Sequence, residues 1–504
     1  MWSPSAQWYA ERVKTTAPLR QQAPLWLGIG IGWWLLWYQG SAFVLSDDFH
    51  GYGWPGYVVN AWSIVHQVDA GYDAFRQPMH AWMLGTLGEA LGSYPHAAVL
   101  LSSTSMALLV LATGVIASLL AGPWAGGLAA AILPTVAATA LSARAANHYP
   151  LQSALAASGV ALALWASQRR APIWRTALAG LVTGLAVAVD GRMVLFALVA
   201  VGILLLQRPL RVIAFVAMIW IGPQVGEQFR LPSQPTGSAR ELLIKQRPVL
   251  LRWAQTSNNP ELIAACQFEP PNVLPSIEAL QRPCAQAMWR HNIHRVMPQH
   301  VPFGRLLTAV AFGMALIPIG LRSWRRNALA SWWMLGAGVP LALQALWVPY
   351  PDRYVLPWAA FLATIVPIAL AKIRPRMLIP IAIISTGVWA WNTDPTDRTA
   401  RHGHSINRIY QQRRDARWTV APLINADPFL DCSGLFVSVS LLPQVTSDPP
   451  MLKTNPQRCE AWIASPPANA WLATNSKDHL AAVAQDAGWH RVYMSTALQV
   501  WQHP

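Results

Sequence analysis

Long runs of apolar residues, separated by short polar connections, fill most of the first 392 positions of the chain. A helix needs about 20 apolar residues to cross the hydrocarbon core of a bilayer, and its backbone groups must then pair within the segment. The pattern therefore predicts an all-α polytopic membrane protein with about eleven transmembrane helices. Their predicted ranges are 24–45, 96–120, 123–142, 151–167, 175–190, 192–206, 210–226, 303–321, 328–348, 354–371 and 376–392.

Three longer polar segments are expected to lie outside the bilayer. Residues 46–95 and 227–302 form two outer loops, and residues 393–504 form a small extracytoplasmic C-terminal domain after the transmembrane domain of residues 1–392. Within the first loop, residues 57–68 mix aromatic, aliphatic and polar side chains. This mixture predicts an interfacial helix lying flat on the membrane, with an ordinary surface helix as the alternative.

The C-terminal domain has the pattern of a small α/β fold. Residues 436–440 alternate between apolar and polar positions like a strand. Residues 478–487 are typical of a short helix, and residues 492–501 predict a returning strand.

The four cysteines all lie in segments predicted to be outside, where an oxidising compartment favours disulfides. Pairing within each segment predicts the bridges Cys266–Cys284 and Cys432–Cys459. Four unpaired thiols are the alternative.

Lysines and arginines predict the orientation, because cytoplasmic connections of membrane proteins are enriched in them. The N-terminal segment is basic, and every second connection is basic without an acidic residue. These residues are Arg12, Lys14, Arg20, Arg169, Arg170, Arg175, Arg208, Arg211, Arg322, Arg325, Arg326, Lys372, Arg374 and Arg376. We therefore expect an integral protein of the plasma or inner cell membrane, with a cytoplasmic N-terminus and an extracytoplasmic C-terminus.

The composition agrees with this class of protein. Hydrophobic residues make up 54% of the chain and charged residues 12%, whereas a typical soluble domain has roughly 25% charged residues. The net charge of +15 does not predict a nucleic-acid partner. The basic residues are scattered among short connections and do not form one patch with stacking aromatics.

Two adjacent carboxylates, Asp47 and Asp48, directly follow the first predicted span. Such a pair suits proton abstraction from an acceptor hydroxyl or the binding of a metal ion. A solvated loop start or a helix cap is the alternative. No residue pattern requires a cofactor, so a divalent cation at this pair stays open.

Other ionisable residues recur at the outer ends of predicted spans, where charges are costly unless they are solvated or paired. They are Arg144, His148, Asp190, Arg192, Asp352 and Arg353. Together they predict a polar cavity in the outer leaflet, and arginine there suits a phosphate group. Separate snorkelling of each side chain to the interface is the alternative.

The string RQPMHAW at residues 76–82 predicts a helix that begins at Pro78. Arg76 and His80 flank the start of this helix, where backbone N–H groups also favour an anion. A structural helix start with incidental charges is the alternative.

In the order and sidedness of these elements the chain resembles the GT-C glycosyltransferases, integral membrane enzymes that use polyprenyl-phosphate-linked sugars. Protein O-mannosyltransferases and the aminoarabinose transferase of lipid A are members. The acidic pair followed by Tyr52, the string at 76–82 and the late string RYVLP at 353–357 are similar to motifs of that family. The chain departs from the family pattern in having Asp48 rather than Glu, and Gln77 where the lipid A enzymes have Lys. A third departure is His80, at a position where an aromatic residue is common.

The resemblance implies a GT-C-like fold and an inverting transfer of a sugar from a polyprenyl-phosphate donor to a hydroxyl of a glycan, lipid or protein acceptor. It implies Asp47 as the general base, with Asp48 as the second choice. It also implies that Arg76, His80 and Arg353 hold the donor phosphate. Arg144, His148 and Arg192 join that set because they lie on the same predicted side.

A membrane transporter or lipid flippase without transferase activity is the main alternative. Transporters place substrate near the bilayer midplane, often between internal repeats. This chain has no detectable repeat, and its charges lie at the ends of predicted spans, which favours an enzyme. A non-catalytic scaffold or polymerase subunit, and a diphosphate-linked oligosaccharide donor, also stay open.

Overall fold

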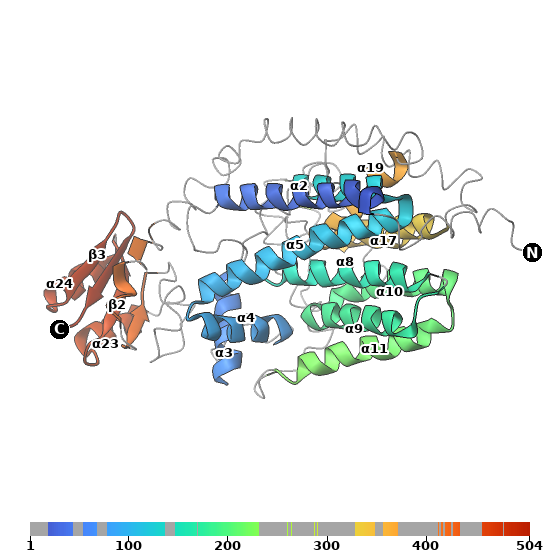
Figure 1. Cartoon of the computed structure of the whole chain (residues 1–504). Coiled ribbons are helices and arrows are strands. Elements are labelled where there is room, and N and C mark those ends of the chain that lie inside the picture. Colours follow the sequence, from blue (N-terminus) through green and yellow to red (C-terminus); the bar gives the residue numbers. More distant parts are fainter. Residues whose placement is uncertain are drawn as a thin grey trace, which may run out of the picture.

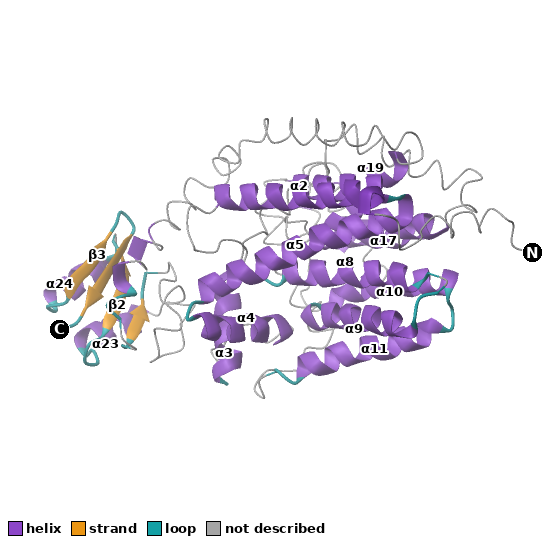
Figure 2. Cartoon of the chain, in the orientation of Figure 1, coloured by secondary structure: helices purple, strands orange, loops and turns teal. Residues whose placement is uncertain are grey.

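The computed structural model describes two parts of the chain, a helical part and a C-terminal sheet (Figures 1 and 2). The described residues are 19–43, 54–67, 78–136, 147–168, 170–230, 328–347, 356–370, 415–416, 419–424, 427–433, 456–476 and 478–504, with the single positions 260, 264, 287, 290 and 412.

The helical part is a bundle in which most of the long helices run roughly along one direction (Figure 1). Its helices are α2 (Leu19–Phe43), α3 (Trp54–His66), α4 (Pro78–Leu91), α5 (Tyr94–Ala121), α6 (Pro123–Ile132), α8 (Tyr149–Ala166), α9 (Ile173–Val189), α10 (Val194–Gln207), α11 (Arg211–Glu227), α17 (Ala328–Trp347) and α19 (Ala359–Leu370). Short 3-10 turns occupy Leu133–Thr135, Gly191–Met193 and Leu356–Trp358.

The helix starts follow from local sequence. Ser93 caps α5 by accepting a hydrogen bond from the backbone N–H of His96 at 3.4 Å, which satisfies one of the four free donors of a helix start. Proline occupies the first turn of α5, α6 and α8, where its missing N–H costs nothing. Gly122, at φ 97°, separates α5 from α6.

Helices coincide with nine of the eleven predicted spans in the described part, and the spans 303–321 and 376–392 lie outside the described residues. Of the span predicted at 123–142, residues 123–136 are described. Its α-helix ends at Ile132 and continues as a 3-10 turn that contains Pro134, because proline cannot continue the α-helical hydrogen bonds.

One described helix, Tyr94–Ala121, is long and apolar enough to cross a membrane by itself. Several others in the described part are apolar but shorter, such as α10 with 14 residues. The number of membrane crossings therefore stays a prediction. The outer faces of α2 and α11 are nonetheless strongly apolar, with Trp37 67% exposed and Ile213 74% exposed.

Helix pairs in the bundle approach very closely where glycines face each other. A Cβ atom added to Gly28 of α2 would lie 2.0 Å from the carbonyl oxygen of Gly127 in α6. One added to Gly222 of α11 would lie 2.0 Å from the carbonyl carbon of Gly184 in α9. Small residues at these crossings let the two backbones come into contact. The resulting van der Waals contacts stabilise the association of apolar helices.

Replacing Gly222 by Leu is expected to destabilise the helical part by about 1–3 kcal/mol, since α11 must move away from α9. Thermal unfolding in detergent measures this effect. Gly30→Leu in α2 is the matched control, because no atom lies within 4 Å of a Cβ at that position. Equal losses in both variants would contradict the close-packing explanation.

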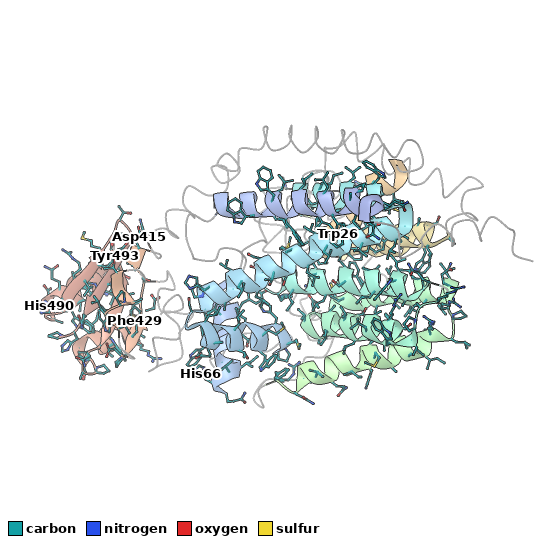
Figure 3. All side chains as sticks on the ribbon, viewed as in Figure 1. Trp26, His66, Asp415, Phe429, His490 and Tyr493 are labelled. Carbon is teal, nitrogen blue, oxygen red and sulfur yellow. A yellow bond between two sulfur atoms is a disulfide. The ribbon has the colours of Figure 1, made fainter. Side chains whose placement is uncertain are left out.

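Helix α3 lies at the same end of the bundle as the C-terminal sheet and crosses the direction of the long helices (Figure 1). Every residue from 57 to 64 is buried. His66 ends the helix (Figure 3), with its Nε2 atom 3.8 Å from Oε1 of Glu89 in α4. The predicted helix is confirmed as a helix. Residues 57–64 are covered by other parts of the chain, and its position flat on a membrane stays a prediction.

The C-terminal part contains a four-stranded sheet in the order β1-β2-β4-β3. Its strands are β1 (Phe429–Asp431), β2 (Trp471–Asn475), β3 (His490–Met494) and β4 (Leu498–Gln502), accompanied by the helices α23 (Pro456–Ala464) and α24 (His479–Asp486). β1 and β2 are parallel, and β4 is antiparallel to both β2 and β3. The mixed sheet with two helices agrees with the predicted small α/β fold.

The predicted helix at 478–487 is confirmed by α24. The predicted strand at 492–501 is wrong as a single element, because β3 and β4 form a hairpin around a turn at Ser495. The oxygen of the Ser495 side chain accepts a hydrogen bond from the Leu498 N–H at 3.0 Å and closes this turn. The predicted strand at 436–440 lies outside the described residues.

The predicted disulfide Cys432–Cys459 is confirmed and joins the end of β1 to α23. Both cysteines are buried. The other predicted pair, Cys266–Cys284, lies outside the described residues. Removing the bridge with Cys432→Ala and Cys459→Ala is expected to cost the C-terminal part about 2–4 kcal/mol, because the unfolded chain gains freedom.

Hydrogen exchange of β2 and β4 in the full-length protein measures this loss. Reductant should accelerate exchange in the wild type and leave the double variant unchanged. Unchanged exchange in the double variant would show that the bridge is dispensable for the sheet.

Candidate functional site

Several helix ends meet at the end of the bundle that faces the C-terminal sheet (Figure 1). α8 and α9 pack antiparallel, so the start of α8 and the end of α9 lie together, and α10 starts after the short turn that follows α9. His148 directly precedes α8, and Asp190 directly follows α9. Residues far apart in the sequence therefore meet at this end.

Asp190 is the centre of the polar contacts at this end. Its Oδ2 atom lies 3.2 Å from Nε2 of His148. The Arg192 Nε–H donates to both carboxylate oxygens at 3.0 Å, and an Nη–H of Arg192 donates to Oδ2 as well. One carboxylate thus joins an imidazole and a guanidinium.

The local sequence explains why these two side chains meet. Asp190 caps the 3-10 turn Gly191–Met193, and its Oδ1 atom accepts a hydrogen bond from the backbone N–H of Arg192 at 2.9 Å. Aspartate forms such turns readily with the N–H two residues on. The Arg192 side chain turns back towards Asp190, so its guanidinium contacts the same carboxylate.

The electrostatics of the pair favour the ionised carboxylate. Burial by itself raises the pKa of Asp190, but the charge of Arg192 and the hydrogen bonds from His148 and Arg192 outweigh it. The net result is a pKa well below the usual value for aspartate. The Asp190 side chain is 10% exposed and that of Arg192 is 38% exposed, so the carboxylate is the more buried partner of the pair.

An aromatic cluster surrounds His148. Its ring stacks on that of Tyr149 with centroids 4.2 Å apart, and the Tyr57 ring of α3 lies 5.4 Å away. The His80 ring of α4 lies 6.2 Å from His148 and 5.9 Å from Tyr57. Arg192 also reaches the Tyr149 hydroxyl at 3.5 Å. Two imidazoles and one guanidinium, from three separate segments, therefore share one site.

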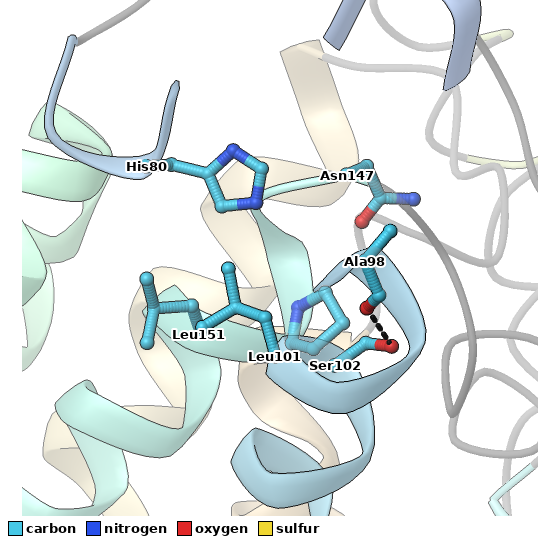
Figure 4. Close-up of a pocket in the computed structure, with 7 residues that line it drawn as sticks. His80, Ala98, Leu101, Ser102, Asn147 and Leu151 are labelled. Atoms are coloured by element: carbon cyan, nitrogen blue, oxygen red, sulfur yellow. Dashed lines mark hydrogen bonds between the residues drawn. The ribbon is translucent and has the colours of Figure 1, made fainter. Parts of the chain in front are cut away.

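A pocket opens beside His80 (Figure 4). It has apolar walls and three polar residues, His80, Ser102 and Asn147. The remaining lining residues are Ala98, Leu101, Pro150 and Leu151. The Asn147 Oδ1 atom accepts a hydrogen bond from the Tyr149 N–H at 3.1 Å, which holds the connection that leads to His148.

Three of the predicted site residues, His80, His148 and Arg192, are described and lie in this site. The other predicted residues, Asp47, Asp48, Arg76, Arg144 and Arg353, lie outside the described residues, and their roles stay predictions. Among the described residues, no group of three His, Cys, Asp or Glu side chains is placed to hold a metal ion.

The sequence placed Asp190 among the charges of the predicted cavity, because it lies at the end of a predicted span two residues before Arg192, but it did not predict the contact with His148. It gave no role to Tyr57, Asn147 or Tyr149. Tyr57 had no signal in the sequence, since its position in the site depends on how α3 packs.

No protein-family model and no curated protein matches the sequence. Among solved structures, ArnT from Cupriavidus metallidurans bound to undecaprenyl phosphate is similar, with 13% identity, a TM-score of 0.45 and coverage of 94% of this chain and 97% of that one. The archaeal oligosaccharyltransferase AglB from Archaeoglobus fulgidus, in complex with an inhibitory peptide and a dolichol-phosphate, has 11% identity, a TM-score of 0.46 and coverage of 95% and 74%. Both are GT-C glycosyltransferases. A likeness at this level assigns no role to any residue.

Proposed function

We propose that this protein is an integral membrane glycosyltransferase of the GT-C type, which moves a sugar from a polyprenyl-phosphate donor to an acceptor hydroxyl. The proposal includes the predicted orientation, with the site on the outer face of the membrane. The acceptor is a glycan, a lipid or a protein.

The observation that best supports this proposal is the convergence of His80, His148 and Arg192. Each was expected near a phosphate from its sequence position alone, and the rings of the two histidines lie 6.2 Å apart. Hydrogen-bond donors that are held in place before reaction stabilise a developing negative charge strongly. A departing lipid phosphate carries such a charge.

The apolar surface of the bundle supports the membrane placement. Large side chains such as Trp37 on α2 and Trp220 on α11 are mostly exposed. Many large apolar side chains exposed along two helices are unusual on a soluble monomer, and lipid chains are their natural surroundings.

In the proposed reaction the acceptor hydroxyl attacks the anomeric carbon of the donor sugar. The Asp47 carboxylate takes the hydroxyl proton, the new glycosidic bond forms, and the bond from the anomeric carbon to the phosphate oxygen breaks. The leaving group departs as a lipid phosphate that keeps the bonding electrons. His80 and His148 donate hydrogen bonds to its oxygens.

Within this scheme Asp190 is a positioning residue. Its carboxylate partly neutralises Arg192 and holds the His148 ring by Nε2. The proposal therefore gives the imidazoles the larger share of the phosphate contacts, and Arg192 contributes from its exposed side.

A transfer assay in proteoliposomes tests the proposal. Purified protein is mixed with a panel of polyprenyl-phosphate sugars and soluble or lipid acceptors, and release of lipid phosphate is measured. Donor-dependent release that requires the protein is the expected result. Movement of intact lipid-linked sugar across the bilayer, with no release of phosphate from any donor, would instead indicate a transporter or flippase.

A further inference from the structure

The opposite end of the bundle carries a second charged surface, formed by the connection between α8 and α9 and the connection between α10 and α11. We name it the basic end and define it by Arg170, Trp174, Arg175, Arg208 and Leu210. Residues 164–189 and 191–226 contain no Asp or Glu. The arginines of the basic end therefore have no acidic residue close to them in the sequence.

Arg211 joins the two connections into one surface. One of its Nη atoms donates to the carbonyl oxygen of Ala166 at 2.8 Å, and the other donates to the carbonyl of Ala171. The start of α11 is thus fixed against the turn between α8 and α9. Arg170 and Arg175 then lie on the same end of the bundle as Arg208.

Arg175 is held in place by two tryptophans. Its Cζ atom lies 3.6 Å from the centroid of the Trp165 ring and 5.6 Å from that of the Trp174 ring. The two indoles meet edge to face, with centroids 5.6 Å apart. A guanidinium fixed on aromatic faces keeps its charge and loses little freedom when it binds an anion.

Large apolar side chains lie between these arginines. Leu210 is 85% exposed, and Ile173 and Trp174 are also mostly exposed. An acidic protein or a nucleic acid would match the arginines and leave these side chains in water. A lipid surface with negative head groups matches both kinds of residue at once.

From this combination we propose that the basic end binds the head group of an anionic phospholipid. The lipid phosphate pairs with Arg170, Arg175 and Arg208, and Leu210, Ile173 and Trp174 enter the boundary with the acyl chains. The inference rests on the membrane placement of the proposed function, but it does not depend on sugar transfer.

Native mass spectrometry of the full-length protein in detergent tests this site, with phosphatidylglycerol and phosphatidylcholine of identical chains as the two probes. The wild type is expected to retain phosphatidylglycerol preferentially. Arg170→Gln with Arg208→Gln should lower its affinity for phosphatidylglycerol on the order of tenfold and leave binding of phosphatidylcholine unchanged.

Arg458→Gln with Arg491→Gln in the C-terminal part removes the same charge and is the matched control. Equal retention of the two lipids by the wild type would overturn the proposal, as would equal effects of the two double variants. If the first variant does not fold, the preference of the wild type should still fall as salt is raised, and a salt-independent preference counts against the site. Absence of sugar transfer together with a retained lipid preference would reject the proposed function and leave this inference standing.

Discussion

The Asp190→Ala protein is expected to unfold more readily than the wild type, by about 1–3 kcal/mol. The substitution removes the partner of Arg192 and His148 and the cap of the turn Gly191–Met193. It leaves a partly buried guanidinium without its carboxylate, which is the costly way to break such a pair. The estimate stays below that for a fully buried pair because the Arg192 side chain is 38% exposed.

Asp190→Asn removes the negative charge but keeps an oxygen that can cap the turn by accepting from the Arg192 N–H. The Asp190→Asn protein should therefore lose less stability than the Asp190→Ala protein. Thermal unfolding in detergent at neutral pH measures both.

Glu460→Ala is the control, since Glu460 pairs through Oε1 with Nε2 of His479 at 3.0 Å on the surface of the C-terminal part. The two side chains are 52% and 61% exposed, so its loss should cost no more than about 1 kcal/mol. Equal losses at the two positions would contradict the central role given to Asp190.

The same pair predicts a dependence on acid. The pKa of Asp190 is lower in the folded protein than its usual value. At pH values between the folded and the unfolded pKa, the folded state therefore binds fewer protons than the unfolded state. The stabilisation is present above about pH 4 and is lost progressively as the pH falls towards the folded pKa. Asp190→Asn should remove this part of the acid sensitivity.

The Asp47→Asn protein is expected to lose sugar transfer by about 10²- to 10⁴-fold, since an amide cannot accept the proton of the acceptor hydroxyl. Donor binding should be kept, because Asp47 is not assigned to the phosphate. Turnover and retention of a polyprenyl-phosphate sugar are measured on the same proteoliposomes.

Asp48→Asn is the natural control, because it changes the neighbouring carboxylate by the same chemistry. A smaller loss there identifies Asp47 as the base, and the reverse order assigns the base to Asp48. Full activity in both variants would remove the acidic pair from the mechanism.

Much of the helical part followed from local pattern. The apolar runs placed helices such as α5 and α8 within about two residues of their observed ends, because the length of such a run depends only on neighbouring residues. The pair Cys432–Cys459 was also predictable, since only 27 positions separate them within one segment.

What local pattern missed has long-range causes. The residues of α3 predicted a helix, but only tertiary contacts decided that residues 57–64 are buried. The apolar run at 492–501 continues through a turn, so its pattern resembled one strand although β3 and β4 pair with each other.

The sequence by itself determined which segments are helical and apolar, which ones carry arginines without neighbouring acidic residues, and that His80, His148 and Arg192 are candidates for anion binding. These properties depend on residue type and short spacing. Only the tertiary structure decided that Asp190 joins His148 to Arg192, and that Tyr57 and His80 complete the cluster. The physical reason is that antiparallel packing of α8 and α9 brings together positions 42 residues apart, and no local pattern encodes which helix ends meet.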